Sequence, residues 1–165
     1  MAVTLTVEQQ ALKELGRALR AETDGKAIRK DLIRQLKQPL QPAVTEIKSG
    51  VMSMASGGLS HGGEPLRAAV ARKIRAEAKL SGYAVGVRVR ARKTEAVRGF
   101  RNAPKRLNSP KGWRHPVFGS DRWVQQIGKP RYFDEPLEGR KAEFRRAVIE
   151  AMDSTARRIG YRIKL

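Results

Sequence analysis

Few residues in this chain have the types and spacing that catalysis or metal binding would need. The two histidines, His61 and His115, lie far apart in the sequence and make a poor metal site without acidic partners. His115 lies between Arg114 and Pro116, in a segment rich in aromatic residues. We therefore interpret His115 as a hydrogen-bonded structural residue, because polar groups in buried segments are normally paired.

Three carboxylates suggest the divalent-cation site of a nuclease: Asp121, Asp134 and Glu135. Asp121 follows a Gly-Ser turn, however, and the other two stand where helix caps and first-turn acids belong. The glycine pairs at 57–58 and 62–63 do not form a phosphate-binding loop, since the pattern G-x-x-x-x-G-K-[ST] is absent. The chain has no cysteine, which excludes disulfides and thiolate metal sites. We therefore predict no enzymatic activity, no metal, no cofactor and no small-molecule substrate.

The most unusual stretch, residues 113–137, reads WRHPVFGSDRWVQQIGKPRYFDEPL. It holds five of the nine aromatic residues, interleaved with glycine and proline, which restrict the backbone to particular shapes. We predict a folded docking element in which Trp113 and Phe118 are buried, either within the subunit or at an interface. Stacking of Trp113 and Trp123 on exposed bases is the alternative, although such tryptophans more often anchor a core or a protein interface.

This stretch resembles the tail-completion and neck proteins of long-tailed bacteriophages. The resemblance lies in seven consecutive residues and a spaced group after them: Trp113, Arg114, His115, Pro116, Val117, Phe118, Gly119, Trp123, Tyr132, Phe133 and Pro136. It implies a virion structural protein of the head–tail interface, made in the host cytoplasm. It also implies a ring, with six subunits favoured, around a channel for double-stranded DNA. The implied partners are the head connector and the tail-tube or tail-terminator proteins.

The net charge of +19 is concentrated in the middle of the chain. Residues 51–133 hold eighteen basic and four acidic side chains, and residues 88–114 hold ten basic side chains and one acidic, Glu95. Such a concentration attracts polyanions. The residues expected to face a partner or DNA are Arg88, Arg90, Arg92, Lys93, Arg98, Arg101, Lys105 and Arg106. A basic nucleic-acid-binding protein is therefore the alternative function, and acidic neighbouring subunits or simple solubility also account for the charge.

No run of about eighteen apolar residues is present, so we expect no transmembrane helix and no membrane partner. The N-terminus lacks the basic and apolar regions of a secretory signal.

Helices are expected at both ends of the chain. Thr6 and Gln9 form a capping-box pattern that opens an amphipathic helix, and Asp24-Gly25 separates it from the next. Apolar residues then recur with helical spacing, and Pro39 and Pro42 interrupt them, which predicts a long, kinked helix over residues 25–55. A glycine-rich loop follows at 56–63. Near the C-terminus, a helix is expected to start at Pro136, bury Phe144, Val148 and Met152, and end at Gly160.

The central region shows the spacing of strands. Residues 72–91 alternate between apolar and polar side chains around Ser81-Gly82, which predicts a β-hairpin. One or two helical turns are expected before it, and a helix through residue 80 is the alternative. Its apolar residues are expected to contact Val148 and Met152: Ile74, Ala76, Val85, Val87 and Val89.

Residues 92–112 lack periodicity and predict a long basic loop, with at most one helical turn near Thr94. Residues 113–118 predict a strand, and residues 123–127 a short strand or a packed loop. The fold class is therefore α+β, in a single structural domain of residues 1–165. It comprises two N-terminal helices, the second long and kinked, a small antiparallel sheet built on a β-hairpin, and a C-terminal amphipathic helix.

Overall fold

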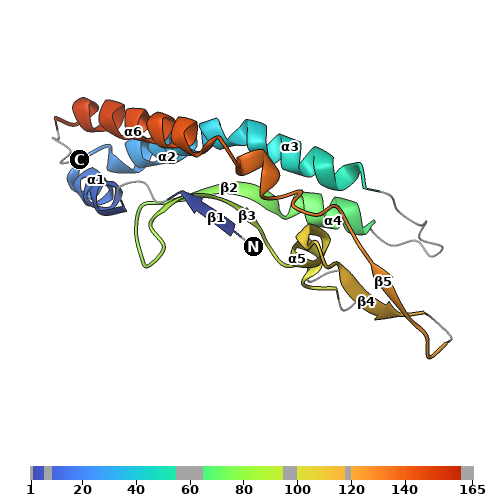
Figure 1. Cartoon of the computed structure of the whole chain (residues 1–165). Coiled ribbons are helices and arrows are strands. Elements are labelled where there is room, and N and C mark those ends of the chain that lie inside the picture. The colour runs from blue at the N-terminus through green and yellow to red at the C-terminus, as the bar shows by residue number, and fades with distance from the viewer. Residues whose placement is uncertain (1, 6–8, 55–64, 95–99, 118–119, 161–165) are drawn as a thin grey trace. The chain divides into compact units, whose positions relative to one another are not determined.

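The computed structural model describes residues 2–5, 9–54, 65–94, 100–117 and 120–160, and it has the predicted α+β fold (Figure 1). The chain forms two compact units, each assembled from separate stretches of sequence. We call residues 2–42, 76–89 and 139–165 the helical unit, and residues 43–75 and 90–138 the hairpin unit.

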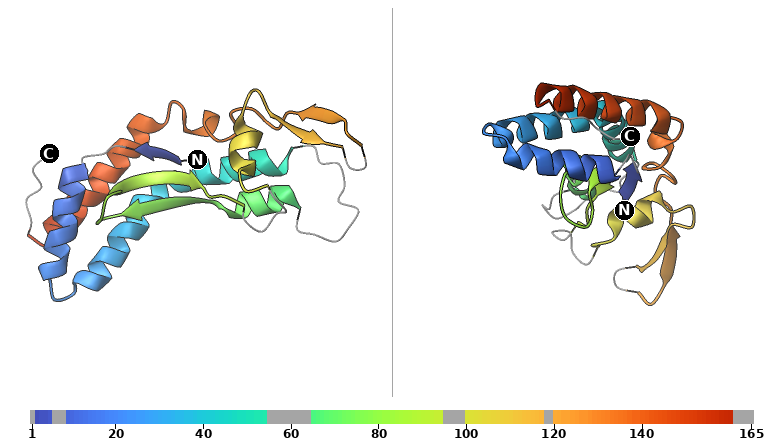
Figure 2. Two further views of the ribbon diagram at one scale, coloured as in Figure 1. Left: turned by 90° about the horizontal axis from the view of Figure 1, so that it is seen from below. Right: turned by 90° about the vertical axis from the view of Figure 1, so that its left-hand side faces the viewer.

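Three helices form most of the helical unit: α1 (Gln9–Ala21), α2 (Gly25–Lys37) and α6 (Lys141–Arg158). Figure 2 shows α1 and α6 lying beside α2, and their apolar stripes are buried there. Gly25 allows the tight connection from α1, because a Cβ at this position would lie 1.8 Å from the Leu19 carbonyl oxygen.

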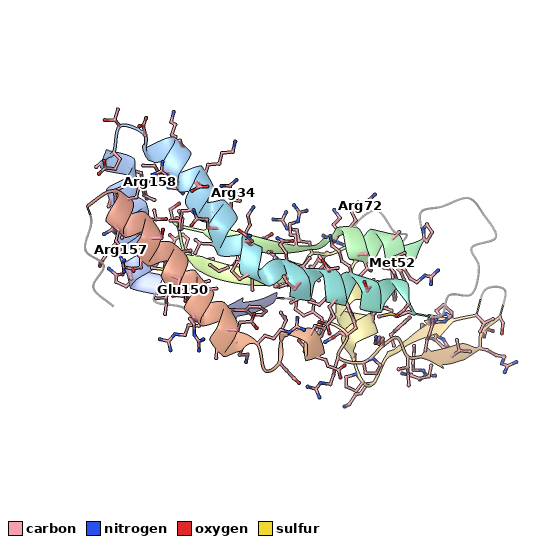
Figure 3. All side chains as sticks on the ribbon, turned by 90° about the horizontal axis from the view of Figure 1, so that it is seen from above. Arg34, Met52, Arg72, Glu150, Arg157 and Arg158 are labelled. Carbon is pink, nitrogen blue, oxygen red and sulfur yellow. The ribbon has the colours of Figure 1, made fainter. Side chains whose placement is uncertain are left out.

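Polar contacts on the surface add a link between α2 and α6. Asp31 of α2 forms an ion pair with Arg34 of the same helix, and its other oxygen lies 3.8 Å from Arg158 of α6 (Figure 3). Arg157 pairs with Asp153 one turn away on α6. Apart from Asp31, these side chains are about half or more exposed, so we ascribe most of the packing energy to the buried leucines.

The long helix and its break follow the prediction. After α2 the chain makes one 3-10 turn, η1 (Gln38–Leu40), and continues as α3 (Gln41–Met52). The turn occurs at Pro39 because proline has no N–H to continue the α-helical ladder. The predicted amphipathic helix near the N-terminus is confirmed as α1, and the capping box at its start stays a prediction. Thr6 and the glycine-rich loop at 56–63 lie outside the described residues.

The predicted β-hairpin is present, and the alternative of a helix through residue 80 is wrong. A short helix, α4 (Leu66–Arg72), leads into β2 (Ile74–Lys79), which pairs with β3 (Gly86–Ala91). The apolar hairpin residues named above are buried. A strand that the sequence did not suggest, β1 (Ala2–Leu5), pairs with β3 and gives the sheet order β1-β3-β2. The expected contact between the hairpin and Val148 or Met152 stays a prediction; α6 packs on α2, α1, η1 and β1.

Residues 92–112 are not one continuous loop as predicted. They contain α5 (Ala103–Asn108), which begins with Pro104 in its first turn, where a fixed φ favours the start of a helix. Thr94 is buried outside any helix, and its hydroxyl donates to the Phe100 carbonyl oxygen at 2.7 Å. Residues 95–99 lie outside the described part.

The C-terminal helix begins later than predicted. Pro136 lies in a 3-10 helix, η2 (Glu135–Leu137), and Gly139, with φ of +78°, separates it from α6. The helix ends at Arg158, and Gly160 takes φ of +64° just beyond it, as its predicted role as a stop requires. Among the described residues, no helix has the length and apolar character needed to cross a membrane.

Candidate interaction surface

The motif residues form a second β-hairpin, separate from the three-stranded sheet. It consists of β4 (Trp113–Pro116) and β5 (Trp123–Gln126), which pair antiparallel (Figure 1). The four facing pairs are Trp113 with Gln126, Arg114 with Gln125, His115 with Val124, and Pro116 with Trp123. The strand prediction for residues 123–127 is thus confirmed over most of its length. The single small sheet that we predicted is instead two sheets.

Because side chains alternate along a strand, the register gives this hairpin two faces. The inner face has Trp113 and His115 on β4 and Val124 on β5, all half-buried, together with the exposed Gln126 opposite Trp113. The outer face has four exposed residues in two facing pairs: Arg114, Gln125, Pro116 and Trp123.

Aromatic stacking holds the inner face in place. The Trp113 ring lies 5.3 Å from the Phe100 ring, with a tilt of 55° between their planes. On the other side, the Arg106 guanidinium of α5 lies 5.2 Å from the centre of the Phe100 ring, within range of a cation–π contact. Trp113 is therefore half-buried in the single chain, and its further burial at an interface stays a prediction. Phe118 and Gly119 lie outside the described residues.

A second anchor lies at the C-terminal end of the hairpin. Tyr132 and Phe133 are buried with their rings 6.4 Å apart, edge to face, and the Tyr132 hydroxyl donates to the Pro104 carbonyl oxygen at 3.2 Å. Burial, together with the charge of Asp134, raises the pKa of Tyr132 well above its ordinary value. The hydroxyl therefore stays protonated and keeps donating its hydrogen bond.

Asn108, at the end of α5, fixes the same segment through both its backbone and its side chain. Its carbonyl oxygen accepts from the Arg131 N–H at 2.9 Å, and its Oδ1 accepts from the Phe133 N–H at 2.9 Å. Its Nδ2 donates to Asp134 Oδ2 at 2.6 Å. The predicted capping role of Asp134 is thus wrong for its side chain, which makes no cap hydrogen bond at η2 and holds Asn108 instead. Glu135 does lie in the first turn of η2, as predicted.

Two glycines permit this close packing. At Gly112, where φ is +60°, a Cβ would lie 2.0 Å from the Gln126 carbonyl oxygen. At Gly128, a Cβ would lie 2.8 Å from both Cα and the carbonyl oxygen of Leu107 on α5. Neither position tolerates a side chain without a backbone shift. The sequence showed both as turn residues and gave no sign of the segments they approach.

Beyond these anchors, the hairpin exposes apolar side chains. Trp123 and Ile127 are each 57% exposed, and Val117 is 37% exposed. In a single chain, the predicted docking element is therefore only partly buried. Among the described residues of 113–133, only Tyr132 and Phe133 are fully buried. An interface that covers the exposed residues stays a prediction.

The predicted basic residues have different surroundings. Arg88, in the helical unit, lies 3.4 Å from Glu77 across the β2–β3 pair, and their side chains are only 13% and 10% exposed. Arg88 is thus held by its own chain and is poorly placed to face a partner. In the hairpin unit Arg90 is half-buried on the same strand face, and Arg98 lies outside the described residues. The exposed members of the set are Arg92, Lys93, Arg101, Lys105 and Arg106.

The candidate chemical residues remain apart. In the described part of the chain, no three His, Cys, Asp or Glu residues are grouped so that they could hold a metal ion. The Nδ1 atom of His115 lies 3.0 Å from the Pro116 carbonyl oxygen, in keeping with a structural hydrogen bond. Asp121 is exposed in the turn between β4 and β5, while His61 and the glycine pairs lie outside the described residues. The hairpin unit exposes an apolar group of side chains, Val117, Trp123 and Ile127, together with basic side chains.

No known protein family, curated protein or solved structure matches this chain.

Proposed function

We propose that this chain is a structural subunit of a phage virion at the head–tail interface, a tail-completion, tail-terminator or related neck protein. The observation that carries the proposal is the β4–β5 hairpin, which is formed by residues 113–126 of the stretch that resembles this family. Its inner face and C-terminal end are held by Phe100, Asn108 and Pro104, while Trp123 and Ile127 are left exposed. A rigid element with an exposed aromatic residue is suited to docking, since little conformational freedom is lost on binding.

In this proposal the subunit forms a closed ring, with six copies favoured, and joins the tail to the head connector around the DNA channel. Ring closure brings two different patches of each subunit together. The charge constrains the neighbours, because six copies at +19 each would carry roughly one hundred net positive charges. Such a ring requires acidic proteins or DNA beside it to offset the repulsion. The mature protein would be found in the virion after assembly in the host cytoplasm.

A nucleic-acid-binding protein is the second candidate, favoured by the exposed side chains of Lys93, Arg101 and Lys105. Salt dependence of binding to duplex DNA distinguishes the two functions. A protein that makes six or more phosphate contacts should lose roughly a thousand-fold or more in affinity between 50 and 200 mM salt. A neck subunit should instead show weak DNA binding and assemble with connector or tail proteins.

Deletion of the gene from the phage or prophage that encodes the chain tests the leading proposal. We expect filled heads and free tails that fail to join, and rescue when the wild-type chain is supplied in trans. Native mass spectrometry of the chain with its purified connector and tail partners should then reveal a ring. Normal virions after deletion would refute the proposal, as would a monomeric protein that cleaves DNA with Mg²⁺.

Lys93→Glu with Lys105→Glu tests the part assigned to the basic region. Both side chains are exposed, so we expect a folded protein that supports less head–tail joining. Full rescue of the deletion by this double variant would show that the basic residues have no part in joining.

A further inference from the structure

We infer that the outer face of the β4–β5 hairpin docks into an apolar pocket rimmed by acidic residues on a different protein. This inference names the chemistry of a partner and rests on the proposed function only for the choice of proteins to test. The face comprises Arg114, Pro116, Trp123 and Gln125, and Ile127 continues the row two residues after Gln125.

The apolar part of this face comprises the Pro116–Trp123 pair and Ile127, with Gln125 between them on β5. Trp123 is directly opposite Pro116 in the register, and Ile127 is as exposed as Trp123. Tryptophan is the residue most enriched among those that dominate binding energy at protein interfaces, especially when it enters a desolvated pocket. The inner-face anchors keep the hairpin in one shape, so that the tryptophan is presented in advance of binding.

Charge identifies the pocket's rim. Residues 111–131 carry five basic side chains and one acidic, Asp121: the basic ones are Lys111, Arg114, Arg122, Lys129 and Arg131. All five are exposed, and only Arg131 has an ion pair described here, with Glu138. Arg114 lies on the outer face itself, and the other four lie in the segments next to the strands. Complementary charge around an apolar centre speeds association and selects among partners, so an acidic rim is the complement of this surrounding charge.

A second copy of the chain does not supply that rim. Two hairpins facing each other would bring like charges together, which is unfavourable. Elsewhere the chain is also basic, since basic residues outnumber acidic ones in each of the stretches 1–50, 51–133 and 134–165. Duplex DNA would match the charge but would leave Pro116, Trp123 and Ile127 against a polar, phosphate-lined surface. A different protein is the occupant that satisfies both the apolar row and the charge.

Site-specific photocrosslinking during phage assembly tests the inference. A benzoyl-phenylalanine in place of Trp123 should crosslink to an acidic surface of another protein, identified by mass spectrometry. The matched control replaces Tyr83, a fully exposed aromatic residue in the β2–β3 turn of the helical unit. It should not crosslink to the same site. A crosslink from position 123 to a second copy of this chain or to DNA would overturn the inference, and so would no crosslink in assembled particles.

Binding of the crosslinked protein, purified, then measures the contribution of each part of the face. Trp123→Ala should weaken binding by at least about thirty-fold, the lower bound for a dominant interface residue. Arg114→Glu with Arg122→Glu should slow association and remove its salt dependence. Lys26→Glu with Lys30→Glu changes the net charge equally at exposed positions on α2, and it should leave binding unchanged.

The two proposals fail separately in these experiments. A crosslink to an acidic protein that is absent from virions would uphold the docking face and refute the neck assignment. If the chain is present in the neck but binds the crosslinked protein with unchanged affinity after both Trp123→Ala and Ile127→Ser, the neck assignment would stand and the docking face would be refuted. Circular dichroism of each variant ensures that lost binding reflects a lost contact, because these exposed positions should not affect folding.

Discussion

Substitution of Asn108 by alanine should destabilise the hairpin unit selectively. The change leaves the backbone bond from Arg131 intact and removes both side-chain bonds, to the Phe133 N–H and to Asp134. Phe133 is fully buried, so its N–H has no water to replace the lost acceptor. An unsatisfied buried donor costs about 1–3 kcal/mol, and the lost bond to a half-exposed carboxylate adds about 1 kcal/mol. We expect a decrease of about 2–4 kcal/mol in the free energy of unfolding.

Both tryptophans lie in the hairpin unit, which makes the assay selective. Tryptophan fluorescence during urea unfolding follows this unit, while far-UV circular dichroism follows mainly the helices. The matched control is Asn102→Ala, since Asn102 is exposed at the start of α5 and makes no side-chain cap hydrogen bond. It should change stability by less than about 0.5 kcal/mol. Equal stabilities of the two variants would refute the role that we assign to Asn108.

Further predictions concern the glycines, a buried tyrosine and an ion pair. Gly128→Ala should destabilise the protein by about 1–3 kcal/mol, because its Cβ would meet the Leu107 backbone. Gly50→Ala in α3 should be neutral or stabilising by up to about 1 kcal/mol, since among the described residues only Lys129 Nζ, at 3.6 Å, would be near the new Cβ. Thermal melts that show the same stability for Gly50→Ala and Gly128→Ala would contradict this. Burial raises the pKa of Tyr132 above its unfolded value, so its contribution to stability is present below about pH 10 and declines as pH rises further. Tyr132→Phe removes the hydrogen bond to Pro104, so the free energy of unfolding should fall by about 1 kcal/mol at neutral pH. In urea titrations above about pH 10, the stability of this variant should fall less steeply than that of the wild type. An equally steep fall would mean that other groups cause the loss of stability. For Arg88 and Glu77, a double-mutant cycle with alanine should give a coupling energy of about 1–3 kcal/mol, because both side chains are largely buried. A coupling energy near zero would mean that Glu77 does not hold Arg88, and Arg88 would again be a candidate for facing a partner.

Local sequence determined the elements whose signals are carried by neighbouring residues. Proline has no backbone N–H, so Pro39 and Pro42 predicted an interruption of the helix over residues 25–55; it occurs as a 3-10 turn at Pro39, while Pro42 lies in the first turn of α3. Alternation around Ser81-Gly82 likewise identified the β2–β3 hairpin, since the period of two follows from the strand itself. Six-residue α5 and four-residue β1 were missed because elements so short show no period and, unlike β4 and β5, neither contains an aromatic residue.

Only the tertiary structure decided which aromatic residues are buried. Trp113, Trp123, Tyr132 and Phe133 have similar neighbours in the sequence, yet their exposure ranges from none to more than half. The difference comes from partners distant along the chain, such as Phe100 for Trp113 and Pro104 for Tyr132, whereas Trp123 lies on the face without an anchor.

The same reason separates the basic residues. In the sequence, Arg88 and Arg92 are both arginines in the same basic stretch. In the structure, Glu77 on the neighbouring strand pairs with Arg88 and leaves it largely buried. Composition determined that the chain is strongly basic, because charge is a sum over residues. Which of the basic side chains are exposed depends on which segments pack together, and so does the exposure of the apolar side chains beside them. Packing is a property of the folded chain.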